Sequence, residues 1–153
     1  MKKVLSLLLL IATLLVACKK EEKPEIPKPV LPSKEITSNS SACYSYIKNK
    51  DTIQANLIVQ SGKVSGDLIY KLFEKDKNIG TIAGIMKGDT LFAEYTFMSE
   101  GTSSIREVAF LRKNNELIEG YGDMKDVAGK MVFKDKKSLN FAGSIILKET
   151  PCK

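Results

Sequence analysis

Hydrophobic and polar residues alternate along most of the chain after about residue 42. Over residues 52–60, 63–73 and 90–98, every second residue is apolar and its neighbours are mainly polar. This period of two is typical of β-strands with one buried face. Short turn-forming sequences separate the runs, and no proline occurs between Pro32 and Pro151, as paired strands require. We therefore expect antiparallel strands joined by tight turns.

The number of runs predicts the kind of β-fold. The expected strands lie near 42–48, 52–60, 63–73, 79–87, 90–98, 105–113 and 116–122, with weaker ones near 131–134 and 144–149. Residues 123–130 and 134–140 are polar and are expected to be loops. Eight or nine short strands indicate an all-β fold, an antiparallel meander that closes into an up-and-down, lipocalin-like barrel or a strongly bent sheet of about eight strands. The glycines expected to mark its bends or bulges are Gly80, Gly84, Gly120 and Gly122.

The N-terminus has the features of an export signal. Met1-Lys2-Lys3 is a positively charged N-terminal segment, and Val4 to Val16 is an apolar run of 13 residues. That run is too short for a transmembrane helix, which needs about 20 residues, but it suits a signal peptide. It ends in Leu15-Val16-Ala17-Cys18, a small-residue cleavage site followed by cysteine. We expect residues 1–17 to be removed and Cys18 to carry lipid that anchors the protein to a membrane. The alternatives are an uncleaved signal anchor and a soluble secreted protein.

A tether is expected between the anchor and the β-domain. Residues 19–23 are all charged, and four of the chain's five prolines fall within residues 24–32. Such a segment is semi-extended and cannot bury a core. The expected organisation is therefore a signal peptide at 1–17, a tether at 18–41 and a single antiparallel β-domain at 42–153.

Two cysteines remain once Cys18 is assigned to lipid. In an exported chain, Cys43 and Cys152 are more often a disulfide than two free thiols. The bridge would close a loop of about 110 residues, which stabilises the fold by about 4–5 kcal/mol in the chain-entropy model. A redox or metal role is less favoured, because the two cysteines form no C-x-x-C pattern and the chain has no histidine.

The charge of the chain gives no sign of a nucleic-acid partner. The formal net charge is +6, but it comes mainly from lysine, and the arginines are Arg106 and Arg112 alone. No basic run interleaved with aromatic residues occurs. A solvated lysine surface explains the excess.

Several stretches of the chain resemble a known group of proteins. They are Cys43-Tyr44-x-Tyr46, Glu74-Lys75-Asp76-x-Asn78-x-Gly80-Thr81, Gly88-Asp89-x-Leu91, the run from Tyr95 to Gly101, Ser104 with the run from Arg106 to Leu111, and Glu119-Gly120-Tyr121-Gly122. Together they resemble small uncharacterised lipoproteins of Bacteroidota, such as flavobacteria. The charged residues after Cys18 also resemble the segment that sends such lipoproteins to the outer membrane, although a plain spacer would look the same. The resemblance implies an envelope location, with the side of the membrane left open, and it implies no activity.

The absence of histidine restricts the chemistry of the chain. Ser-His-Asp and Cys-His catalysis and histidine-ligated metal sites are excluded. A glycosidase needs only two carboxylates, but the chain is small and lacks tryptophan, and no spaced calcium loop is present. We expect no catalytic residues, no metal and no cofactor.

A group of charged and aromatic residues is the remaining candidate site. Its members are Glu74, Tyr95, Glu100, Arg106, Glu107, Glu119 and Tyr121. Alternation in the strand expected at 105–113 puts Arg106 on one face and Glu107 on the other. Whichever face points into the barrel therefore buries a charged side chain, and a buried charge needs an oppositely charged or hydrogen-bonding partner. One interpretation is an ion pair, for instance of Arg106 with Glu74 or Glu100. The other is that Arg106 holds an anionic or polar ligand at the open end, flanked by Tyr95 and Tyr121.

These observations predict a lipid-anchored, non-enzymatic envelope protein that binds something. In the first version, a small ligand lies in an apolar cavity lined by residues such as Tyr70, Phe92, Phe97 and Phe110. In the second, the interior is filled and the domain meets an envelope protein as an interaction or inhibitor module.

Overall fold

The computed structural model describes residues 40–143 and 145–152, which form ten strands. The predicted signal peptide, Cys18 and almost all of the tether lie outside these residues. The strands are β1 (Ser40–Lys48), β2 (Asp51–Gln60), β3 (Lys63–Lys71), β4 (Asn78–Lys87), β5 (Thr90–Ser99), β6 (Thr102–Lys113), β7 (Glu116–Glu119), β8 (Met124–Val127), β9 (Lys130–Phe133) and β10 (Ile146–Thr150).

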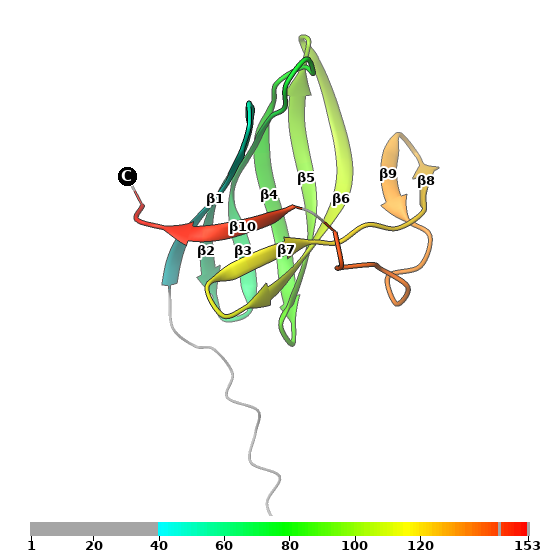
Figure 1. Cartoon of the computed structure of the whole chain (residues 1–153). Coiled ribbons are helices and arrows are strands. Elements are labelled where there is room, and N and C mark those ends of the chain that lie inside the picture. The colour runs from blue at the N-terminus through cyan, green and yellow to red at the C-terminus, as the bar shows by residue number, and fades with distance from the viewer. Residues whose placement is uncertain (1–39, 144, 153) are drawn as a thin grey trace, which may run out of the picture. The chain divides into compact units, whose positions relative to one another are not determined.

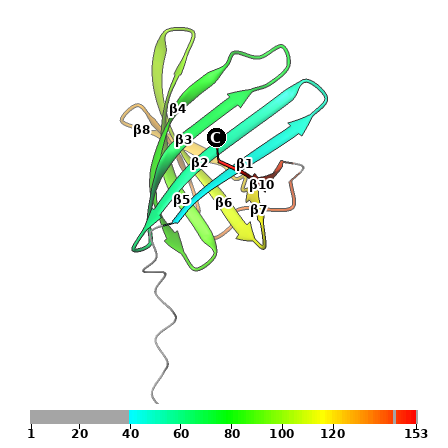
Figure 2. The ribbon, with the colours of Figure 1, turned by 90° about the vertical axis from the view of Figure 1, so that its left-hand side faces the viewer.

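Eight of these strands close into a barrel. Strands β1 to β7 pair each with the next, and β10 lies between β7 and β1, antiparallel to both (Figures 1 and 2). The predicted all-β meander that closes into an up-and-down, lipocalin-like barrel is therefore confirmed. We call the end with the β1–β2, β3–β4 and β5–β6 turns the mouth end.

The remaining two strands form a hairpin outside the barrel, which we call the arm (Figure 1). In it, β8 pairs with β9, and β9 runs parallel to the first half of β6, with Arg106 opposite Met131. The expected loop at 123–130 was wrong, because this segment contains β8. Its residues are mostly exposed and lack the alternation of a half-buried strand. The expected strand at 116–122 ends at Glu119.

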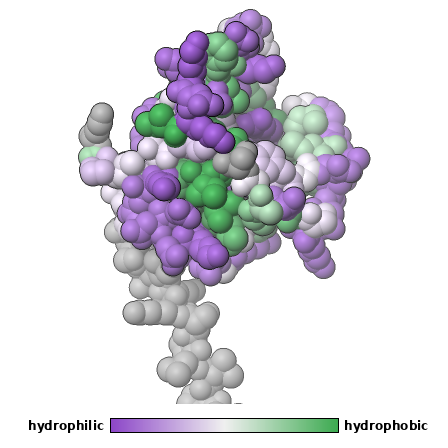
Figure 3. Space-filling view, in the orientation of Figure 1, coloured by the Kyte–Doolittle hydropathy of each residue, from purple (hydrophilic) through white to green (hydrophobic). Residues whose placement is uncertain are grey.

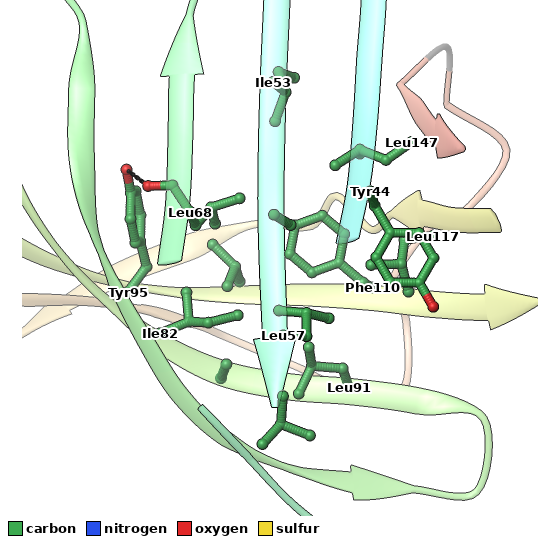
Figure 4. Packing of buried hydrophobic residues seen from close by; sticks show 14 of the residues in the cluster. Tyr44, Ile53, Leu57, Leu68, Ile82, Leu91, Tyr95, Phe110, Leu117 and Leu147 are labelled. Atoms are coloured by element: carbon green, nitrogen blue, oxygen red, sulfur yellow. Dashed lines mark hydrogen bonds between the residues drawn. The ribbon is translucent and has the colours of Figure 1, made fainter. Parts of the chain in front are cut away.

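The barrel interior is filled by side chains from the inward faces of its strands (Figure 4). The largest fully buried residues are Tyr95, Phe110, Ile53, Leu68, Ile82, Leu91 and Leu147. Of the residues named for a cavity, Tyr70, Phe97 and Phe110 belong to this core or pack against it. Phe92 does not, because it alternates with the buried Leu91 and Ala93 and so points outward. The space expected for an apolar ligand is occupied by the protein itself.

Glycine allows neighbouring strands of the barrel to approach closely. A Cβ at Gly84 would overlap the carbonyl oxygen of Phe92, and one at Gly80 would overlap that of Thr96. Both glycines lie in β4, and at these two positions the close approach of β5 leaves no room for a side chain. The register with β5 is unbroken from Ile79 to Lys87, so neither glycine marks a bulge in this pairing.

The disulfide predicted from the cysteine count is present. Cys43 and Cys152 are joined, with an S–S distance of 2.03 Å and a Cα–Cα distance of 5.2 Å. The bond links β1 to the segment just after β10, and these two strands also pair at Cys43 and Thr150. The C-terminal end of the described chain is thus held to the first strand.

Candidate functional site

Polar and aromatic side chains gather inside the mouth end of the barrel. Arg106 lies four residues from the start of β6 and shares the inward face with the buried Val108 and Phe110. Glu119, at the end of β7, is the one charged residue that is buried among the described residues, at 7% exposure. We call Tyr70, Tyr95, Phe97, Arg106, Glu119 and Tyr121 the mouth cluster.

Two tyrosines bind the buried carboxylate. The Tyr70 hydroxyl donates a hydrogen bond of 2.7 Å to Glu119 Oε1, and the Tyr121 hydroxyl donates one of 3.0 Å to Oε2. Hydrogen bonds to a charged acceptor are roughly twice as strong as neutral ones, and they offset part of the cost of burying the charge. Burial raises the pKa of Tyr70 and of Tyr121, and the nearby Glu119 carboxylate adds to the rise. Both hydroxyls therefore stay protonated donors at neutral pH.

Aromatic rings surround the arginine. The guanidinium carbon of Arg106 lies 5.1 Å from the Tyr70 ring centroid, 5.6 Å from that of Tyr95 and 5.5 Å from that of Phe97. These distances are within the range of cation–π attraction. Tyr95 and Phe97 stack at 4.7 Å, and the Tyr95 hydroxyl donates to the Leu68 carbonyl oxygen at 2.9 Å (Figure 4). The rings are thus fixed, and they fix the guanidinium.

Arg106 nevertheless has an unsatisfied donor. Its Nε is buried and has no hydrogen-bond partner among the described residues. None of the ion pairs that the structure shows in this part of the chain includes Arg106. The ion pair considered with Glu74 or Glu100 is not formed, because both glutamates lie exposed in mouth-end turns, with φ of 55° and 47°. A buried donor without an acceptor costs about 1–3 kcal/mol.

Glu107 faces the opposite way and holds the arm. Its Oε1 accepts a 2.6 Å hydrogen bond from Lys136, and its Oε2 accepts one of 3.0 Å from the backbone N–H of Phe133. A second ion pair, between Lys130 and Glu94 at 2.7 Å, fastens β9 to β5. The position of Glu107 is thus explained by its contacts with the arm.

Of the predicted site residues, the structure brings Tyr95, Arg106, Glu119 and Tyr121 together. Glu107 points away from this cluster but lines the same pocket as Arg106 and Glu119, whereas Glu74 and Glu100 lie in exposed turns. Sequence reasoning did not assign Tyr70 and Phe97 to this group. The hydrophobic alternation of their strands could have identified them, because both residues share the inward face of their strand with core residues.

A pocket of about 90 Å³ adjoins the cluster. It is lined by Arg106, Glu107, Val108, Glu119, Gly120, Tyr121, Gly122, Met124 and Phe133.

The described residues contain no group of three or more acidic or cysteine side chains placed to hold a metal ion. They also contain no helix with the length and apolar character needed to cross a membrane. The chain was compared with protein-family models, curated proteins and solved structures, and none of them matches it.

Proposed function

We propose that this protein is a lipid-anchored envelope protein whose β-domain binds a small ligand with an anionic or polar group, without catalysing a reaction. The anchor is proposed from the N-terminal run that ends in Ala17-Cys18. The Cys43–Cys152 disulfide supports export, because such bonds persist in oxidising compartments. The proposed location is the outer membrane, on either its periplasmic or its outer side.

The observation that carries the binding proposal is the buried, unpartnered Nε of Arg106. Buried polar groups are nearly always paired, and exceptions call for an explanation. The three rings around the guanidinium restrict its motion, so little conformational entropy is lost when a ligand binds. An oxygen acceptor on a ligand would satisfy the donor that the protein leaves without a partner.

The binding role is proposed without catalysis because the chain lacks the groups that most hydrolytic reactions need. It has no histidine, and its two non-lipid cysteines are bonded to each other. Glu119 is a carboxylate close to the proposed ligand, but both its oxygens already accept hydrogen bonds from tyrosines. That arrangement holds the carboxylate in place between the two tyrosines.

A protein partner is the second candidate, and the filled interior favours it. Because the core side chains occupy the barrel interior, recognition would use the surface. A groove of about 400 Å³ runs across the outer faces of β2, β3 and β4, with Ile58 and Ile85 at 48% and 45% exposure. Figure 3 shows a further small hydrophobic area over β7 and β10, surrounded by hydrophilic side chains.

Native mass spectrometry of the lipidated protein, purified from the cells that produce it, tests the proposal. The Arg106→Met variant should be compared with Arg112→Met as its matched control. Arg112 is the chain's only other arginine, lies near the opposite end of β6 and pairs with Asp89 at 3.8 Å. The proposal predicts an added mass that is lost on denaturation, present in wild type and Arg112→Met and absent in Arg106→Met. Equal masses in native and denatured runs of all three would favour the partner candidate.

A further inference from the structure

The pocket beside the mouth cluster lies at a seam in the barrel wall. Strand β7 pairs with β6 only from Phe110 onward, and β9 pairs with β6 only at Ile105 and Arg106. Between these two pairings, the pocket takes inward residues from the barrel, such as Arg106 and Glu119, and residues from the arm, such as Phe133. It therefore reaches the mouth cluster from the side of the barrel.

We infer that this seam pocket binds a monoanionic carboxylate on a short apolar stem. The inference rests on the proposed function, and it names the chemical class of the ligand and its route. The seam pocket holds an arginine, two glutamates, a few apolar side chains and exposed backbone, and each of these restricts what fits.

The first restriction comes from the hydrogen bonds. Glu119 already has a donor on each oxygen, so it does not need one from a ligand. Arg106 Nε has no acceptor. The ligand must therefore supply acceptors, and a planar carboxylate matches the fork of donors on a guanidinium.

The second restriction comes from charge. Glu107 and Glu119 both line the seam pocket with Arg106, and Glu107 is paired with Lys136 at 2.6 Å. The remaining charges, Arg106 and Glu119, sum to zero. A phosphate carries about −1.5 to −2 charges near neutral pH, and it would be repelled by the fixed carboxylate of Glu119. A carboxylate carries a single charge and meets less repulsion.

The third restriction comes from size and lining. A volume of about 90 Å³ has room for only a few water-sized groups, which excludes a nucleotide or a lipid chain. Val108 and Phe133 are buried at 4% and 8% exposure, and Met124 lies beside them. These side chains favour a short apolar stem behind the carboxylate, as in a short-chain fatty acid or an acidic side chain of a peptide.

Tyrosine fluorescence provides the assay, because the chain has no tryptophan and three of its five tyrosines belong to the mouth cluster. The lipidated protein with its disulfide formed, held in detergent micelles, is titrated with butyrate, with its neutral isostere butyramide, with inorganic phosphate and with a capped peptide containing one glutamate. We expect a saturable change with butyrate, and binding at least tenfold weaker for butyramide and phosphate. Saturation by the peptide at lower concentration than butyrate would identify a peptide side chain as the source of the carboxylate.

Variants separate binding from folding. Arg106→Met should weaken butyrate binding at least tenfold, Arg106→Lys should restore part of it, and Arg112→Met should leave it unchanged. Each variant is checked for a native circular dichroism spectrum. Equal affinities for butyrate and butyramide, or an unchanged Arg106→Met, would overturn the inference. Tighter binding of phosphate that still requires Arg106 would overturn the carboxylate class while leaving the proposed anion site in place.

Discussion

Removing the hydroxyl of Tyr70 tests how the protein tolerates a buried carboxylate. Tyr70 is 4% exposed, and its hydroxyl donates 2.7 Å to Glu119, itself 7% exposed. Tyr70→Phe keeps the ring in the core and deletes only the donor. Because the Tyr70 side chain is buried in the core, the Glu119 oxygen would lose a hydrogen bond on a side where the protein offers no other donor.

The expected cost of Tyr70→Phe is about 1.5–3 kcal/mol in the free energy of unfolding, the range for hydrogen bonds to charged groups. Tyr121→Phe deletes the other donor, but Tyr121 is 44% exposed, so water can take its place and the cost should stay below about 1 kcal/mol. Tyr44→Phe is the matched control. Its ring is buried at 7% exposure and its hydroxyl makes no hydrogen bond with the described residues, so the change should be within about 0.5 kcal/mol.

Urea unfolding followed by far-ultraviolet circular dichroism measures all three variants under one set of conditions. Equal m-values would show that the variants differ in stability and not in the surface exposed on unfolding. The reasoning is refuted if Tyr70→Phe costs no more than Tyr44→Phe, because Glu119 would then not depend on its donor. It is also refuted if Tyr121→Phe is the most damaging of the three.

Three further predictions concern the rest of the barrel. Cys43→Ser and Cys152→Ser should each lower the free energy of unfolding by about 4–5 kcal/mol, which is the chain-entropy value for a span of 109 residues. The double variant should cost no more than either single variant. Unequal costs of the two single variants in urea unfolding would contradict this prediction. Gly84→Ala should cost at least about 3 kcal/mol or prevent folding, because its Cβ would overlap the backbone of β5; a wild-type melting temperature would contradict this. Burial raises the pKa of Tyr95 to about 12, so the folded state keeps its proton while the unfolded chain ionises near 10. The contribution of Tyr95 to stability should therefore be constant below about pH 10 and be lost between about pH 10 and 12. Full tyrosinate absorbance at 295 nm before loss of the fold would contradict this.

Alternation predicted the barrel because each barrel strand has one face in the core and one toward solvent. In β2, Ile53, Ala55, Leu57 and Val59 are buried and the residues between them are exposed. The arm was predicted only in part: the weak strand expected near 131–134 corresponds to β9, whereas β8 was expected to be a loop. Strand β8 buries no alternate face, and a four-residue strand held by backbone pairing with β9 leaves no hydrophobic period.

The candidate site was predicted in part for a similar reason. Alternation in β6 separated Arg106 from Glu107, but it could not say which of the two faces the interior. The partners of Arg106 and Glu119 come from strands distant in sequence, since Tyr70 and Glu119 are 49 residues apart. Such contacts depend on how the closed barrel brings together strands that are not neighbours in the sheet, and alternation within one strand does not specify this. Glu74 and Glu100 were included only because they are acidic.

The central claim is that the charges of Arg106 and Glu119 are maintained in the mouth cluster for binding and not for the stability of the barrel. Urea unfolding of the double variant Arg106→Met/Glu119→Gln tests it, because both charges are removed together and neither is left alone in the core. Replacing buried charged side chains together by neutral groups of similar size is often neutral or stabilising, and Arg106→Met also removes an unsatisfied donor. The claim predicts a free energy of unfolding equal to or above that of the wild type. A loss of more than about 3 kcal/mol would show that the cluster holds the barrel together, and would contradict the claim.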